Sequence, residues 1–135
     1  EVSYEICAEK NMPYRLQKII EDRKNRPGTF AYKNSKYTYL VVCYGEKPYS
    51  GYSIRIEECW KDKEQLYLKT QLIGPSAGEE IIETRTCPFL VVRCERTEQL
   101  CRIESRRKHI LIAKTISRAK YVRAQKSLCR VEDVL

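Results

Sequence analysis

Short β-type segments alternate rapidly with turn residues through most of this chain, and this alternation limits the folds open to it. Segments rich in β-branched and aromatic residues occupy 29–32, 37–44, 52–59, 65–72 and 90–94. Gly, Pro, Asn and Ser gather in the gaps between them, as expected where strands end in turns. Short strands at this spacing predict a mainly β (α+β) protein, either a small antiparallel β-sandwich or a rolled, barrel-like sheet.

Local patterns refine this expectation. Asn34-Ser35 between the first two segments is turn chemistry and predicts a hairpin. Tyr52, Ile54 and Ile56 alternate with polar residues, which predicts that Tyr52 belongs to the core. Alternation over 1–9 predicts a short first strand, and Ile81, Ile82 and Thr84 predict a further one.

One helix is expected before the hairpin. Pro13 is suited to the first turn of a helix, and Leu16, Ile19 and Ile20 follow at helical spacing. Pro27-Gly28 should end the helix near Asn25.

The last forty residues differ from the rest in charge. Residues 1–95 hold 15 basic and 14 acidic residues, whereas 96–135 hold 11 and 4. The segment also lacks Gly and Pro, which favours helix over most of its length, with a strand at 110–113 as the alternative. We therefore expect a β domain over 1–95 and a basic, mostly helical C-terminal appendage over 96–135.

Neither a metal site nor an active site is expected. Seven cysteines occur without a Cys-x-x-Cys pair, beside the single His109, which argues against structural zinc and any cofactor. We expect mostly reduced, buried thiols; a disulfide framework, with Cys101 or Cys129 more exposed, is the alternative. Ser50 and Ser53 are not in a nucleophile elbow, and the adjacent pairs 57–58 and 79–80 put their carboxylates on opposite sides of a strand. The chain is predicted not to be an enzyme.

The turn-rich loops are the predicted binding site. If alternate connections fall at one end of the sheet, they form a common type of platform for protein partners. The residues chosen there are Lys47, Pro48, Tyr49, Ser50, Gly51, Gly74, Pro75, Pro88 and Phe89. Tyr49 and Phe89 would supply the aromatic contact area found at interface hot spots.

These loops resemble a known family, the C-terminal domain of the protease complex subunit PrcB, over about residues 13–95. The matching positions are Gly45, Pro48, Gly51, Tyr52, Ser53, Ile54, Gly74-Pro75 and Pro88-Phe89 with Val91 and Val92. Ser50 departs from the pattern, since the family usually has a glycine there. The resemblance implies a β-rich, non-enzymatic accessory or scaffolding component of a bacterial secreted or surface protease complex.

A weaker similarity links the same loops to chagasin-like inhibitors of cysteine proteases. The segments 47–52, 74–78 and 87–89 are similar to three inhibitory loops in order and character. The Asn and Trp of those loops are missing here. Loop-inserting protease inhibition is therefore kept as a second alternative.

The basic appendage offers a further alternative, binding of nucleic acid or an anionic surface. Its basic patch consists of Arg106, Arg107, Lys108, Lys114, Arg118, Lys120 and Arg123. Aromatic residues that usually accompany such charge on single-stranded nucleic acid are reduced to Tyr121, which argues against nucleic acid. No apolar stretch is long enough to span a membrane. The resemblance points to an extracellular or cell-surface location, while the cysteine content points to a reducing, cytoplasmic one.

Overall fold

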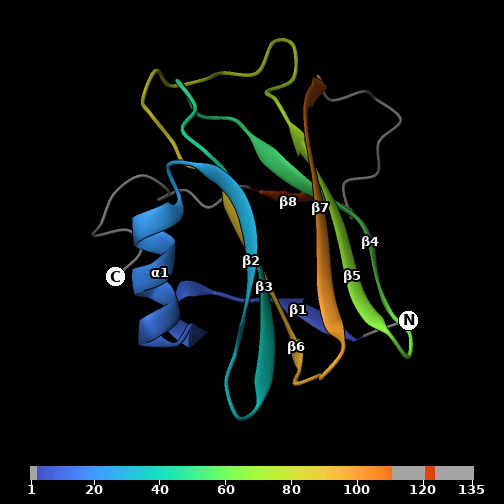
Figure 1. Ribbon diagram of the computed structural model, residues 1–135. Helices are drawn as coiled ribbons and strands as arrows, with labels where there is room; N and C mark the ends of the chain where they lie inside the picture. The colour runs from blue at the N-terminus through green and yellow to red at the C-terminus, as the bar shows by residue number, and fades with distance from the viewer. Residues whose placement is uncertain (1–2, 111–120, 124–135) are drawn as a thin grey trace.

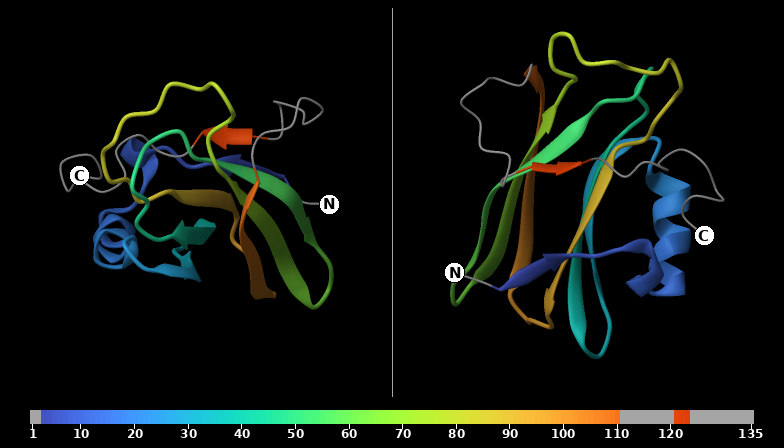
Figure 2. Two further views of the ribbon diagram at one scale, coloured as in Figure 1. Left: turned by 90° about the horizontal axis from the view of Figure 1, so that it is seen from above. Right: turned by 180° about the vertical axis from the view of Figure 1, so that it is seen from behind.

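The computed structural model describes residues 3–110 and 121–123, with the backbone alone described at 107–110 and 121–123. These residues form two four-stranded β-sheets that pack face to face, with one helix on the outside of the first sheet (Figures 1 and 2). The predicted mainly β architecture is confirmed, and of the two forms considered it is the sandwich.

The first sheet is antiparallel throughout and has the order β1-β6-β3-β2. In chain order its strands are β1 Tyr4–Ile6, β2 Pro27–Lys33, β3 Tyr37–Tyr44 and β6 Phe89–Glu95. The second sheet has the order β7-β5-β4-β8 and contains one parallel pair, β5 with β7. Its strands are β4 Ser53–Lys61, β5 Gln65–Ile73, β7 Leu100–Ile110 and β8 Tyr121–Arg123.

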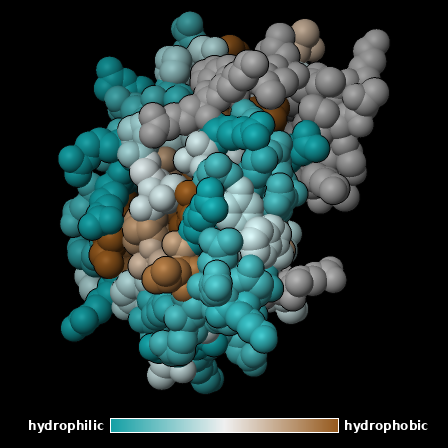
Figure 3. Space-filling view, turned by 45° about the vertical axis from the view of Figure 1, so that its right-hand side comes forward, coloured by the Kyte–Doolittle hydropathy of each residue, from teal (hydrophilic) through white to brown (hydrophobic). Residues whose placement is uncertain are grey.

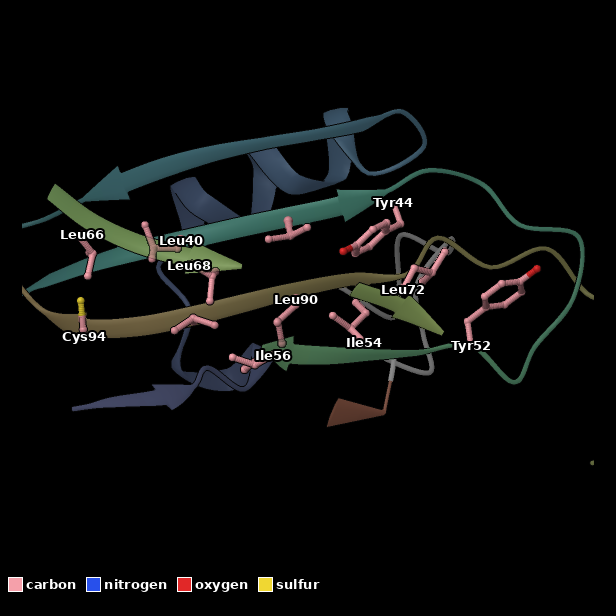
Figure 4. Packing of buried hydrophobic residues seen from close by; sticks show 12 residues of the cluster. Leu40, Tyr44, Tyr52, Ile54, Ile56, Leu66, Leu68, Leu72, Leu90 and Cys94 are labelled. Carbon is pink, nitrogen blue, oxygen red and sulfur yellow. The ribbon is translucent and has the colours of Figure 1, made fainter. Parts of the chain in front are cut away.

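The main hydrophobic core lies between the two sheets. Alternate residues of the central strands face it, including Leu40 of β3, Ile54 of β4 and Leu68 of β5, all 0% exposed. Tyr52 is 4% exposed in the same cluster, so its predicted place in the core is confirmed (Figure 4). Period-two alternation fixes this core because successive strand residues point to opposite faces of a sheet.

A second core lies between the helix and the outer face of the first sheet. The helix, α1, spans Tyr14–Arg23 after a short 3-10 turn at Glu9–Asn11, and it confirms the predicted helix. Leu16 and Ile20 are fully buried, one helical turn apart, against Val41 and Phe89. The opposite face of β3 thus serves this core, which explains why nearly all of β3 is apolar.

One strand prediction is wrong. Residues 81–84 are not a strand, because Ile81 and Ile82 are exposed and no described residue forms a β-ladder with them. Helix was favoured over most of 96–135, and most of that expectation lies outside the described residues; where the structure describes this segment, 100–110 form β7 and 121–123 form β8. Alternating Cys101, Ile103 and Ser105 pair in register with the core-facing side of β5, and this tertiary pairing overrides helix propensity.

The chain beyond residue 95 is therefore not wholly separate from the β body. β7 is an edge strand of the second sheet and pairs with β5 along most of its length. The β structure continues past residue 95 into β7, and the division into two domains at that residue stays a prediction. The predictions for 111–120 and 124–135, including the helix and Cys129, lie outside the described residues.

The described cysteines include five free thiols, at 7, 43, 59, 94 and 101. Cys43 is 2% exposed beneath the helix, and burial raises the pKa of its thiol from about 9 to about 12. A raised pKa in the folded state means that the thiol stays neutral where the same thiol in the unfolded chain ionises. Burial of Cys43 is therefore a source of alkali sensitivity.

Stability should accordingly fall as the pH rises from about 9 to about 12, by up to about 1.4 kcal/mol per pH unit from Cys43. Urea unfolding of the wild type and of Cys43→Val across this range measures the effect. The valine variant has no group to titrate and should lose less stability with rising pH. Equal slopes for both proteins would contradict the assignment.

Candidate functional site

Two long loops of the sandwich meet at one end of the molecule. The β3–β4 loop covers 45–52 and the β5–β6 loop covers 74–88, and both lie at the top of Figure 1. A bridge joins them, since Lys47 N–H donates to Thr86 O at 2.7 Å and Thr86 N–H donates back to Lys47 O at 3.0 Å. The Thr86 hydroxyl also donates to Tyr49 O at 3.0 Å. The sequence-based expectation that these loops share one end agrees with this geometry.

Ser50 holds the exposed part of the β5–β6 loop. Its backbone N–H donates to Ile82 O at 3.0 Å, and its hydroxyl accepts a hydrogen bond from Ile82 N–H at 2.9 Å. Ile82 O also accepts from Thr84 N–H at 2.8 Å. The serine that departs from the family pattern thus fixes the backbone of Ile82 from two sides, which a glycine could do from only one.

Gly51 brings the two loops into direct contact. Its φ is +96°, a conformation that L side chains rarely adopt. A Cβ at this position would lie 3.1 Å from Pro75 and 3.3 Å from Ile81. Gly51 is therefore required both by its dihedral angle and by the close approach of Pro75.

An aromatic pair anchors the base of the loops. Tyr49 stacks on Tyr52 with ring centroids 5.6 Å apart and planes 24° apart. Burial, together with a hydrogen bond to Tyr49, raises the pKa of Tyr52 to about 12, so its hydroxyl stays neutral. Tyr49 is half-buried, and its neighbour Pro48 is exposed. The pair joins the exposed loop surface to the core between the sheets.

Two isoleucines project from this loop end. Ile82 is 67% exposed and Ile81 is 39% exposed. We call the surface formed by Pro48, Tyr49, Ile81 and Ile82 the loop patch. Glu80 and Glu83 flank the isoleucines, and Glu46 lies 3.5 Å from Arg85 beside them. The loop patch is apolar with an acidic border, in a chain of net charge +8.

The structure separates the predicted binding residues into exposed and buried groups. Lys47, Pro48, Tyr49, Ser50, Gly51 and Pro75 are exposed or half-buried in the joined loops. Gly74 and Pro88 are buried, and Phe89 is 1% exposed in the core beneath the helix. Phe89 was expected to offer aromatic contact area to a partner, and its burial corrects this, because alternation along β6 turns it toward α1.

Sequence reasoning missed Ile81 and Ile82 as surface residues. Adjacent residues of a strand point to opposite faces, so a strand would have buried at most one of the two in a given core. Acidic residues surround the two isoleucines in the sequence, at Glu79, Glu80 and Glu83. They were the signal that neither face of a strand at this position would be apolar. Glu79 accepts hydrogen bonds from Ser76 N–H at 2.9 Å and from its hydroxyl at 3.1 Å, which closes the turn before the isoleucines.

The predicted basic patch is only partly described. Arg106 is exposed on β7, and Arg107 and Lys108 follow it on the same strand. Arg123 lies on β8, while Lys114, Arg118 and Lys120 lie outside the described residues. His109 is also on β7.

Within residues 3–110 and 121–123, no group of three His, Cys, Asp or Glu residues is arranged to hold a metal ion. No helix in this part is both long and apolar enough to cross a membrane.

Comparisons with known proteins agree with the loop motifs. No curated protein and no solved structure matches the chain. A family model does match it, that of the PrcB C-terminal domain, over residues 38–95. This range runs from β3 to β6 and includes both joined loops, although it is shorter than the 13–95 expected from the motifs. The resemblance is therefore confirmed: residues 38–95 of this chain are a match to the PrcB C-terminal family.

Proposed function

We propose that this protein is a non-enzymatic binding module that holds a protein partner through the loop patch. The observation that carries the proposal is the exposure of Ile82, 67%, on a backbone fixed by hydrogen bonds to Ser50. Large apolar side chains are costly to leave in water, and a cluster of them on a surface is typical of an interaction site.

Preorganisation supports this function. The loop that carries Ile81 and Ile82 is joined to the β3–β4 loop at Ser50 and Lys47, and it contacts Gly51. A partner would therefore lose little free energy in ordering it, since the backbone is already held in one conformation. Loops positioned by a rigid β scaffold are a common place for recognition.

The border of the loop patch indicates the chemistry of the partner. Glu80 and Glu83 are exposed beside the isoleucines, and Glu79 and Glu46 lie in the same loops. The basic residues of these loops are Lys47 and Arg85, and Arg85 is paired with Glu46. The complementary surface is an apolar pocket with a basic rim.

The family match supports a more specific role. Members of this family are named for a protease complex subunit, and residues 38–95 match it. We propose that the partner belongs to a bacterial secreted or surface protease complex, in which this chain is an accessory or scaffolding component. The loop patch would contact the complex without itself carrying out chemistry.

Replacing Ile82 with aspartate tests the proposal. The variant should retain the fold and reduce partner binding at least about tenfold, because a charge replaces the most exposed apolar contact. Tyr14→Asp is the matched control, since Tyr14 is 66% exposed on α1, away from the loops. Affinity capture from extracts of the source cells, quantified for each variant, gives the comparison.

Loss of the same bound protein with Ile82→Asp but not with Tyr14→Asp would support the loop patch. Equal capture by all three proteins would overturn it. If deletion of 111–135 abolished capture instead, and salt did so in the wild type, binding would be assigned to the basic appendage.

A further inference from the structure

The turn from α1 into β2 borders a hollow of about 240 Å³. It lies where the helix ends and the chain enters the first sheet, at the upper left of Figure 1. Its lining includes Arg23 and Arg26 from the helix end and the turn, Gly28 and Phe30 from β2, and Cys43 from β3. Cys43 is 2% exposed and therefore forms the floor. The hollow shares no residue with the loop patch.

Glycine at position 28 leaves this space empty. Register places Gly28 opposite Cys43, so both positions face the side of the first sheet that carries the helix. A Cβ at Gly28 would meet no atom within 4 Å, and the φ of Gly28 is not in the positive region. The backbone therefore accepts any L residue here. The hollow is open because position 28 has no side chain, and a larger residue would fill it.

The floor of the hollow is apolar. Burial keeps the thiol of Cys43 neutral by raising its pKa, and a neutral thiol behaves as a small hydrophobic group. The half-buried ring of Phe30 forms one side of the hollow. An alkyl group placed against these two residues would lose its contact with water, which favours binding. Most of the face seen in Figure 3 is hydrophilic, and its hydrophobic side chains occupy limited areas.

Two arginines give the hollow a cationic rim. The Arg23 guanidinium lies over the Phe30 ring, 4.9 Å from its centroid. Stacking uses the flat face of a guanidinium and leaves the N–H groups in its plane available to an acceptor. Arg26 is exposed on the turn. Among residues 3–110, neither arginine forms an ion pair with a carboxylate. The rim therefore offers two positive charges to a ligand.

We propose that the hollow binds a carboxylate that carries a short alkyl chain, either a free organic acid or the C-terminal residue of a peptide. The alkyl chain lies against Cys43 and Phe30, and the carboxylate accepts hydrogen bonds from Arg23 and Arg26. Arginine suits this role because its planar group matches both oxygens of a carboxylate. At about 30 Å³ for each water-sized group, the hollow holds about eight such groups. An acid of the size of 4-methylpentanoate fills it.

A small inorganic anion matches the hollow less well. Phosphate has no apolar part, so it would leave the floor at Cys43 uncovered. The hollow also lies at the C-terminal end of α1, where the helix dipole is negative and disfavours a concentrated negative charge. Arg26 N–H donates to Arg23 O at 3.0 Å, which satisfies one of the last carbonyls of the helix. The arginine side chains are therefore the cationic groups that a ligand meets, and they suit a single carboxylate.

Titration of the whole chain with 4-methylpentanoate, followed by nuclear magnetic resonance of backbone amides, tests the site. The amide signals of Gly28, Thr29 and Phe30 should shift and reach saturation. Two probes serve as controls: 4-methylpentanamide has the same shape without the charge, and inorganic phosphate has charge without the alkyl chain. Each should bind at least about tenfold more weakly than the acid. Equal affinity of the acid and the amide, or shifts confined to other parts of the chain, would overturn the proposal.

Three substitutions locate the ligand. Gly28→Val fills the hollow and should weaken binding of the acid at least about tenfold, with Gly28→Ala as a smaller version if the valine variant does not fold. Arg26→Gln should reduce the preference for the acid over the amide. Arg15→Gln makes the same charge change at an exposed position in the first turn of α1 and should leave that preference unchanged. Wild-type binding by a folded Gly28→Val protein, or an equal effect of Arg15→Gln and Arg26→Gln, would reject the site.

A tripeptide that ends in leucine distinguishes the two sources of the carboxylate. If the ligand is the end of a partner chain, the peptide with a free C-terminus should bind at least about tenfold more tightly than 4-methylpentanoate, because its backbone adds contacts beyond the hollow. If the ligand is a free acid, the peptide should bind more weakly. Either result supports a carboxylate site, whereas failure of both probes to bind would reject it.

Discussion

Replacing Phe89 with alanine is expected to lower the free energy of unfolding by about 3–5 kcal/mol. Phe89 is 1% exposed and packs with Leu16, Ile20 and Val91 between the helix and the first sheet. Removing its ring takes away buried apolar area and leaves a cavity that the surrounding strands cannot fill. Chemical denaturation followed by circular dichroism measures this loss.

Ile82→Ala is the matched control for Phe89→Ala. Ile82 is exposed, so its truncation should change stability by less than about 0.5 kcal/mol. At a temperature where both variants are folded, partner capture should fall for Ile82→Ala and persist for Phe89→Ala. The opposite pattern would be a folded Phe89→Ala protein that no longer captures its partner. That result would show that Phe89 contributes to partner binding.

Replacing Gly51 with alanine is expected to destabilise the loop end by roughly 2 kcal/mol. A positive φ costs a residue with a Cβ about 1–2 kcal/mol. The added methyl would also press on Pro75 at 3.1 Å and on Ile81 at 3.3 Å. Since Ile81 belongs to the loop patch, partner affinity should fall together with stability.

Gly78→Ala separates the two causes. Gly78 has φ +83°, and a Cβ there would meet nothing within 4 Å, so this variant carries the dihedral cost alone. The difference between the two unfolding free energies, roughly 1 kcal/mol, measures the contact of Gly51 with Pro75. Equal destabilisation by both substitutions would show that the close approach of Pro75 to Gly51 does not contribute to the loss of stability.

Much of the fold could be predicted because its signals are local. The alternation of Tyr52, Ile54 and Ile56 assigned one face of β4 to the core, and the Asn34-Ser35 turn identified the hairpin of β2 and β3. The helix was visible from Leu16 and Ile20 after Pro13. Each of these patterns spans only a few residues, so the chain expresses it without tertiary information.

The candidate site was predictable only in outline. Turn residues located both loops, but burial decided which of their side chains a partner can reach. Phe89 and Ile82 show this in opposite directions, since the aromatic residue is buried and the isoleucine is exposed. Neither outcome follows from residue type, because both depend on which element covers the position.

The sequence by itself determined a β-rich body with one early helix, loops at one end, and a match to the PrcB C-terminal family. Only the tertiary structure decided that residues 100–110 form a strand, because β5 pairs with them over a long sequence separation. It also decided that Ser50 fixes the backbone of Ile82, although the two residues are far apart in the sequence. These features depend on pairing between distant segments, where tertiary contacts override local preference.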